Sequence, residues 1–304
     1  MSAPVVQLSN VTKRIGNRTI IDQLSLDLQP GEVYGFLGPN GSGKTTTIRM
    51  MVGLMKLSGG EVLIKGHSIQ SDYEKAIRQV GAIVENPEMY KFLSGYKNLL
   101  HFARMVPGIT RQRIDEVVKL VGLQARIHDK VKTYSLGMRQ RLGVAQAIMH
   151  KPSLLILDEP TNGLDPVGIR ELRDYLRKLA KEEGITVFVS SHLLSEMELM
   201  CDRVAIIQNG KLIDQRVISQ DGPAADALLT YRFEVDRPED AATLLSNHRT
   251  KVENGSVELE VDRESAASIN SQLVASGIKV YGFRVLSKSL EEQFLEITGG
   301  ETVG

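Results

Sequence analysis

A glycine-rich loop near the start of the chain constrains the fold more than any other feature of the sequence. It matches the pattern G-x-x-x-x-G-K-[ST] in full, and its members are Gly38, Pro39, Asn40, Gly41, Ser42, Gly43, Lys44 and Thr45, with Thr46 following. The apolar run 33–37 before it predicts a buried strand, and 46–55 after it predicts the start of a helix. In that order, successive backbone N–H groups can enclose phosphate oxygens at the positive end of the helix. We therefore expect a nucleoside triphosphate site rather than an accidental glycine-rich turn.

A second apolar run supplies the acids that such a site needs. Residues 154–157 are Leu-Leu-Ile-Leu, and Asp158 and Glu159 follow directly. Lys44 is expected to reach the β- and γ-phosphates, while the Thr45 hydroxyl and Asp158 are expected to hold Mg²⁺. Glu159 is placed to accept a proton from the water that attacks the γ-phosphate. A strand that ends in acids is common by itself, but downstream of a phosphate loop it favours catalysis.

Composition limits the class of protein. The chain has 304 residues, which suggests one main domain and a smaller one, and 37 basic residues balance 37 acidic ones. That balance argues against nucleic acid as a partner over the whole surface. Cys201 is the single cysteine, so no internal disulfide can form and a reducing compartment fits. No apolar run has the length of a membrane span, and residues 1–7 do not resemble a signal peptide. We expect a cytoplasmic chain without direct membrane insertion.

The pattern of elements predicts an α/β fold with a smaller second domain. Residues 5–37 are β-rich, with Leu24, Leu26 and Leu28 alternating with polar residues. About 87–150 is helical, with an apolar stripe at Ile114, Val117, Val118 and Val121 that predicts a helix ending at Gly122. Asn209-Gly210 between two apolar runs predicts a hairpin over 203–215. We expect a nucleotide-binding domain over 1–220 and a small α+β domain over 221–304. The latter has predicted strands at 231–235, 257–261 and 278–285, and a predicted helix at 263–276 that places Ala266, Ile269 and Leu273 on one face. A capping box at 289–292 opens a last predicted helix.

A further anion site is predicted between the loop and the acidic strand end. Ser135 and Gly137 lie in Tyr-Ser-Leu-Gly-Met-Arg-Gln, directly before an apolar helix over 141–149. The hydroxyl, the glycine backbone and the helix N-terminus can together bind an anion. Taken alone, the segment is only a capped helix start, and its place between the two other motifs is what favours the anion site.

This ordered set of motifs resembles the nucleotide-binding subunits of ABC transporters, from about residue 5 to about residue 215. The resemblance identifies 38–45 as Walker A, 154–159 as Walker B with the catalytic glutamate, and 134–138 as the signature. It also implies that Asp165 belongs to the D-loop and that His192, after Ser190 and Ser191, contacts the γ-phosphate. It implies a P-loop core with an antiparallel β subdomain and an inserted helical subdomain, which binds and hydrolyses ATP with Mg²⁺ between two copies of the chain.

Three positions depart from the common pattern of that family. The signature, usually Leu-Ser-Gly-Gly-Gln, keeps Ser135 and Gly137 but differs around them. Glu85 takes the place of the Q-loop glutamine, where it can accept hydrogen bonds from a metal-bound water. Ile15 stands where an aromatic residue usually stacks on adenine. The loss of stacking predicts ATP affinity weaker by about 1–3 kcal/mol and poor discrimination between ATP and GTP.

With Glu85 in the Q-loop and this form of the signature, the sequence resembles the group of ABC transporters that exports bacitracin or confers lantibiotic immunity. The resemblance implies a separate transmembrane permease subunit, a peripheral position on the inner face of the cell membrane, and a peptide antibiotic or similar amphipathic cargo. An apolar docking surface at 85–96 is formed by Met89, Tyr90, Phe92 and Tyr96, unless these residues only pack the helical subdomain. The other candidates are a soluble ATPase of this type acting on DNA or ribosomes, and a regulator that binds without catalysis. One uninterrupted domain, no heptad array and intact catalytic residues favour the transport subunit.

Overall fold

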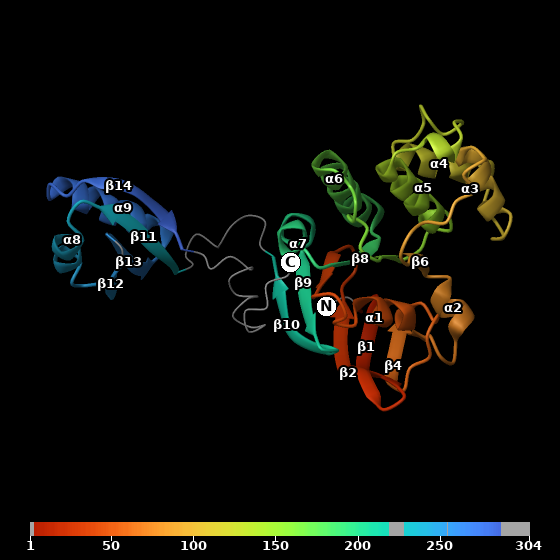
Figure 1. Ribbon diagram of the computed structural model, residues 1–304, viewed down its shortest axis with the longest axis horizontal. Coiled ribbons are helices and arrows are strands. Elements are labelled where there is room, and N and C mark those ends of the chain that lie inside the picture. The colour runs from red at the N-terminus through yellow and green to blue at the C-terminus, as the bar shows by residue number, and fades with distance from the viewer. Residues whose placement is uncertain (1–2, 219–227, 254, 287–304) are drawn as a thin grey trace. The chain divides into compact units, whose positions relative to one another are not determined.

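The computed structural model describes residues 3–218, 228–253 and 255–286, and within these it has two compact units that divide after Ile218. The first unit is built on a mainly parallel sheet with the strand order β10-β9-β3-β8-β7-β6 (Figure 1). Only β10 runs antiparallel to its neighbour. Its strands are β3 Val33–Leu37, β6 Val80–Ile83, β7 Leu154–Leu157, β8 Thr186–Ser191, β9 Arg203–Gln208 and β10 Lys211–Val217.

The central strands of this sheet are apolar because both faces are covered. Every residue of β3, β7 and β8 is buried, as expected for parallel strands with other elements on either side. Helices α1 Lys44–Met51, α6 Pro166–Glu183 and α7 Leu194–Met200 connect or flank these strands. The strands predicted at 33–37 and 154–157 are thereby confirmed, as is the helix after the glycine-rich loop.

An antiparallel sheet with the order β2-β1-β4-β5 packs against the same core. Its strands are β1 Val6–Ile15, β2 Arg18–Leu28, β4 Gly59–Ile64 and β5 His67–Ser68, and α2 Tyr73–Ile77 follows them. Leu24, Leu26 and Leu28 are buried while the residues between them are exposed. The predicted alternation in β2 therefore places one face of this sheet in the core.

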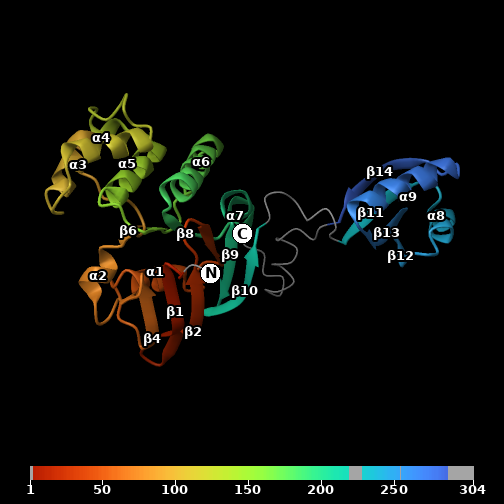
Figure 2. The same ribbon diagram turned by 180° about the vertical axis from the view of Figure 1, so that it is seen from behind.

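The helical segment is a group of its own. Helices α3 Gly95–Ala103, α4 Arg111–Leu120 and α5 Leu136–Ile148, with the short 3₁₀ turn Val131–Thr133, contact one another. Figures 1 and 2 show this group beyond β6, on the opposite side from β1, β2 and β4. In α4 the predicted stripe is buried, and Gly122 after it adopts φ +66°, a left-handed conformation that ends the helix.

The predicted hairpin at Asn209-Gly210 joins β9 to β10. Both residues have positive φ, 49° and 78°, as a two-residue turn between twisted strands requires. The turn also contacts the glycine-rich loop. The N–H of Gly210 donates to the Ser42 carbonyl oxygen at 2.9 Å, and the Gly210 carbonyl accepts from the N–H of Asp22 at 2.9 Å. A Cβ at position 210 would lie 2.1 Å from the Ile20 carbonyl oxygen, so only glycine fits there.

The second unit is a β-α-β-β-α-β fold with a fully antiparallel sheet of order β12-β13-β11-β14. Its elements are β11 Leu229–Val235, α8 Pro238–Leu244, β12 Thr250–Glu253, β13 Ser256–Val261, α9 Arg263–Ala275 and β14 Val280–Val285. The predicted strands and the helix with Ala266, Ile269 and Leu273 inward are confirmed. Helix α8 and strand β12 were not predicted. The helix expected from the capping box at 289–292 lies outside the described residues.

Candidate functional site

The predicted site lies where parallel strands end. Leu37 of β3 pairs with Ser191 of β8, and Leu157 of β7 pairs with Val189 of β8. The carboxyl ends of these neighbouring strands therefore meet at one edge of the sheet. The glycine-rich loop, the acids after β7 and His192 after β8 all begin at that edge, which is where open α/β sheets bind ligands.

Two glycines shape the phosphate loop. A Cβ on Gly38 would lie 2.4 Å from the Ile207 carbonyl oxygen and 2.6 Å from Ser42 Oγ. Gly43 has φ +112° immediately before α1, and a Cβ there would lie 2.4 Å from Ile21 Cδ1. The loop backbone is packed too closely for side chains at these positions. Its N–H groups, rather than its side chains, form the surface that a ligand meets.

The loop also holds an unsatisfied hydroxyl. Ser42 Oγ is buried without a hydrogen-bond partner among the described residues. A buried hydroxyl without a partner carries a free-energy cost, and a phosphate oxygen as acceptor would remove it. Thr45 and Thr46 lie half-buried in the first turn of α1, where N–H groups have no intrahelical partners. These observations fit a triphosphate with its charge at the helix N-terminus.

Lys44 is held inside the loop. Its Nζ donates to the Gly38 carbonyl oxygen at 2.6 Å and to the Pro39 carbonyl oxygen at 3.2 Å. It also forms an ion pair with Glu159 Oε1 at 3.2 Å, and its side chain is 6% exposed. The structure thus joins the predicted phosphate-binding lysine directly to the predicted base.

Ser190, which is fully buried in β8, orients both acids after β7. Its Oγ donates to Asp158 Oδ1 at 2.6 Å and accepts from the backbone N–H of Glu159 at 2.9 Å. Asp158 is only 3% exposed. A single hydroxyl therefore fixes one oxygen of the Asp158 carboxylate and the backbone from which the Glu159 side chain projects.

Glu159 is the centre of the charged cluster. Its Oε2 lies 2.8 Å from Nδ1 of His192, in addition to the contact between Oε1 and Lys44. Its φ of +49° is uncommon for a residue with a side chain and carries strain. The chain turns sharply at this residue and directs its carboxylate between the loop lysine and the histidine.

The predicted Mg²⁺ ligands differ in burial. Asp158 and Glu85 follow β7 and β6, neighbouring parallel strands that end at the same edge of the sheet, but Glu85 is 62% exposed. Glu85 forms an ion pair with Arg49 of α1 and has φ +68°. In the described parts of the chain, no group of three or more acidic, histidine or cysteine side chains is arranged so that it could hold a metal ion by itself. One buried carboxylate beside a phosphate loop suits Mg²⁺, which keeps several waters and binds nucleotide phosphates.

The remaining predicted residues begin helices. Ser135 caps α5 by accepting from the N–H of Met138 at 3.2 Å, and Asp165 caps α6 by accepting from the N–H of Gly168 at 2.8 Å. Gly137 lies near this second segment, since a Cβ there would be 3.7 Å from Leu164 Cδ2. The predicted signature and the predicted D-loop therefore lie side by side within one chain.

A cavity of about 240 Å³ lies over the phosphate loop. It is lined by Ile20, Asn40, Gly41, Gly43, Lys44, Thr45, Thr46, Glu159 and Asn162. Ser135, Gly137, Asp165 and Glu85 are not among these residues. Within one chain the cavity is therefore lined by the glycine-rich loop and the predicted base Glu159, and the predicted signature residues lie outside it.

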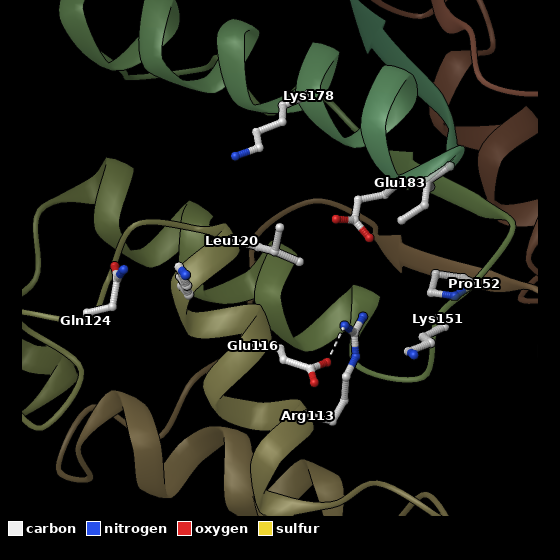
Figure 3. Close-up of a pocket in the computed structure, with 10 residues that line it drawn as sticks. Arg113, Glu116, Leu120, Gln124, Lys151, Pro152, Lys178 and Glu183 are labelled. Atoms are coloured by element: carbon white, nitrogen blue, oxygen red, sulfur yellow. Dashed lines mark hydrogen bonds and ion pairs between the residues drawn. The ribbon is translucent and has the colours of Figure 1, made fainter.

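A larger cavity, of about 640 Å³, lies elsewhere in the first unit (Figure 3). Its walls come from α4, α6 and the segments that precede β7 and β8, where Pro152 and Ile185 lie. It is therefore at the amino ends of the strands, the opposite edge from the phosphate loop. Arg113 and Glu116 pair with each other within it. The smaller cavity is the candidate nucleotide site, because the glycine-rich loop and Glu159 both line it.

Several residues at the site were not predicted from the sequence. Ile20 lines the cavity, Ser190 orients the acids, and Arg49 pairs with Glu85. Asn162, which also lines the cavity, belongs to the segment 162–165 that the family resemblance identifies as the D-loop. Ile20 comes from the antiparallel sheet, and no local pattern marks it. Ser190 follows the apolar run 187–189 in a fully buried strand, and a buried hydroxyl at a strand end is the one feature that points to it.

The loop, the acids and the parallel sheet define a P-loop nucleoside triphosphatase. Residues 21–162 match the family model described as "ABC transporter". The chain is 61% identical to the uncharacterized ABC transporter ATP-binding protein YhcH of Bacillus subtilis (strain 168), over 97% of this chain and 96% of the relative. It is 39% identical to the bacitracin transport ATP-binding protein BcrA of Bacillus licheniformis, over 99% of both chains.

Among solved structures, the dimeric structure of MJ0796, a bacterial ABC transporter cassette, is similar with a TM-score of 0.62 and 26% identity. That match covers 70% of this chain and 99% of the cassette. The chain belongs to the ATP-binding proteins of ABC transporters, and it is an ATP-hydrolysing enzyme. This confirms the predicted fold class and the predicted class of function, and it does not favour an ATPase acting on DNA or ribosomes.

Proposed function

We propose that this chain powers the export of a peptide antibiotic, or a similar amphipathic compound, through a separate permease subunit in the membrane. One observation carries the proposal. The match to a bacitracin transport ATP-binding protein extends over 99% of both chains and so includes the second unit as well as the cassette. Within the described residues, no helix is long and apolar enough to cross a membrane. The chain then works at the inner face of the cell membrane as a peripheral, cytoplasmic subunit.

The chemistry at the site is hydrolysis of ATP with Glu159 as the general base. The carboxylate accepts a proton from the attacking water, and His192 contacts the γ-phosphate. Lys44 and the loop N–H groups stabilise the charge on the phosphates. Asp158, Thr45 and Glu85 are the proposed Mg²⁺ ligands, directly or through water, and the ion neutralises phosphate charge when bound. Ser190 holds Asp158 and Glu159 in place for these roles.

A second copy of the chain completes each site. Ser135 and Gly137 lie outside the cavity of their own chain, but Ser135 Oγ and the first N–H groups of α5 form a donor set suited to an anion. Donors from the second copy then meet the γ-phosphate from the side that the loop leaves open, with Asp165 beside them. ATP thus bridges two copies, and its hydrolysis lets them separate.

A patch of aromatic side chains is the proposed contact with the permease. Phe92 is 69% exposed and Tyr90 is 44% exposed, and their rings lie edge to face at 5.9 Å. The buried Asn98 holds this segment, since it accepts from the N–H of Tyr90 at 2.8 Å and donates to the Tyr90 carbonyl at 3.1 Å. Of the residues predicted for this surface, Met89 is buried and packs inside. A rigid backbone that presents exposed rings favours docking over internal packing for Tyr90 and Phe92.

The test is protection of a sensitive host. The chain and the membrane protein that co-purifies with it would be expressed together, and growth would be measured against bacitracin and a lantibiotic. We expect the minimum inhibitory concentration to rise for at least one of these compounds, and Glu159→Gln to abolish the rise. Equal sensitivity with the wild-type pair and with Glu159→Gln, in cells that contain both proteins at the membrane, would contradict the proposal.

A further inference from the structure

The outer edge of β14 in the second unit is unusually apolar for an unpaired strand. Among the described residues, β14 is the last strand of the sheet and pairs on one side only, with β11. Three of its side chains are exposed and apolar or aromatic: Tyr281 is 70%, Phe283 47% and Val285 36% exposed. An exposed edge of this kind is a template for pairing with another strand.

The opposite edge of the same sheet is protected. β12 spans only Thr250–Glu253, and Lys251 forms an ion pair with Glu253 at 2.6 Å. Short length and charged side chains are the usual means of preventing edge-to-edge pairing. The contrast between the two edges of one sheet indicates that β14 has a partner.

Within the part of the chain that the structure describes, the outward backbone groups of β14 have no hydrogen-bond partner, and they lie in a defined register. Pairing with β11 is regular from Gly282 to Val285, and the N–H of Leu286 donates to the Thr230 carbonyl oxygen. In an antiparallel pair, alternate residues direct their N–H and C=O to the same neighbour. Arg284 and Gly282 therefore bond to β11 like Leu286, and the N–H and C=O groups of Phe283 and Val285 point outward.

We propose that the second units of two copies of this chain pair through β14, antiparallel, about a two-fold axis at Phe283. In this register Phe283 of each copy faces Phe283 of the other, and these two residues exchange hydrogen bonds through their outward N–H and C=O groups. Gly282 then lies opposite Arg284 of the second copy. A register centred one residue later would place Arg284 against its own equivalent, where like charges repel. The two four-stranded sheets form one continuous sheet.

A second copy is the occupant that the strand itself favours. Its outward N–H and C=O groups and its apolar side chains are complementary to themselves under a two-fold axis, which is what an isologous contact requires, and the register keeps the two Arg284 side chains apart. The proposed two-copy nucleotide site also brings two such units together, and this part of the argument rests on the proposed function. Where two cassettes are also paired, tethering raises the effective concentration of the two edges, with further gains of about 10²–10⁴ in overall affinity.

The experiment is cysteine cross-linking of the full chain without ATP and without a membrane protein. Cys201 is fully buried and burial raises the pKa of its thiol, so it stays unreactive. Phe283→Cys places two thiols at the axis, where an aligned pair has Cα atoms about 5.5 Å apart, within disulfide range. We expect mild oxidation at high protein concentration to link most of the chain as dimers. Val252→Cys, at 37% exposure on the protected edge, is the matched control and should stay monomeric.

A second variant separates pairing from folding. Val285→Pro removes only an outward N–H and adds a ring on the outer side, so the bond pattern with β11 is kept. In sedimentation at the same concentration, we expect wild type to self-associate and Val285→Pro to do so at least tenfold more weakly, with an unchanged circular dichroism spectrum. Monomeric wild type, or cross-linking of Val252→Cys as efficient as that of Phe283→Cys, would overturn the proposal. Because no ATP is used, either result leaves the transport assignment standing.

Discussion

Replacing Ser190 by alanine removes a hydroxyl that makes two bonds in a fully buried place. One bond goes to the Asp158 carboxylate at 2.6 Å and the other comes from the Glu159 N–H at 2.9 Å. A hydrogen bond to a charged group contributes about 1.5–3 kcal/mol, and a neutral one about 0.5–1.5 kcal/mol. We therefore expect Ser190→Ala to lower the free energy of unfolding of the first unit by about 3 kcal/mol, which lowers Tm by roughly 6–12 °C.

Ser191→Ala is the matched control for this change. Ser191 is the next residue in the same strand and is equally buried, but its hydroxyl accepts only from the N–H of Leu193 at 3.0 Å. Thermal and urea unfolding of both variants would be followed by circular dichroism. If Ser190→Ala lowers the free energy of unfolding no more than Ser191→Ala does, the claim that the Ser190 hydroxyl supports both acids is wrong.

The same variant has a kinetic consequence, because Ser190 positions the base without lining the nucleotide cavity. We expect kcat for ATP hydrolysis to fall by about tenfold or more, equivalent to about 1.4 kcal/mol of barrier, while the KM for ATP changes little. A raised KM with normal kcat would mean that Ser190 supports nucleotide binding rather than the position of Glu159.

Four other substitutions test separate parts of the site. Glu159→Gln should keep ATP binding, lower hydrolysis by at least about a hundredfold and accumulate an ATP-bound dimer in gel filtration; normal hydrolysis would show that another group is the base. Lys44→Ala should weaken binding of a fluorescent ATP analogue by about tenfold or more, since it removes a charged donor. Ile15→Tyr should strengthen ATP binding by about 1–3 kcal/mol and increase the preference for ATP over GTP. Unchanged nucleotide affinities would show that adenine does not stack on residue 15. Gly38→Ala should abolish nucleotide binding, because its Cβ would lie 2.4 Å from the Ile207 carbonyl oxygen.

Much of the cassette could be predicted because its sequence patterns are local. The loop needs its glycines at fixed offsets, the buried strands are continuous apolar runs, and the Asn209-Gly210 turn has one dominant conformation. The apolar stripe Ile114, Val117 and Val118 predicted helix α4, and Gly122 predicted where it ends. In each case the chemistry of a few adjacent residues decides the structure.

The features that were missed depend on contacts between distant segments. The Arg49–Glu85 pair joins residues 36 positions apart, and nothing near either residue indicates the other. An exposed pair such as this stabilises the fold by less than about 1 kcal/mol, so its interest is that it offsets the charge of Glu85. β12 is short and charged, and α8 is short with Pro238 at its start, so neither has the periodicity that reveals an element. Their places are set by the sheet they complete.

The contact between Gly210 and the Ser42 carbonyl changes what the β9–β10 turn can tolerate. Hairpin turns at a protein surface usually accept inserted residues, affinity tags and loop exchanges, because their backbone groups face water. Here the turn is bonded to the phosphate loop on one side and to Asp22 of β2 on the other. A tag or an insertion between Asn209 and Gly210 would therefore reshape the nucleotide site itself. Library designs and labelling sites in this cassette should leave this turn intact, although its sequence alone marks it as an ordinary connection.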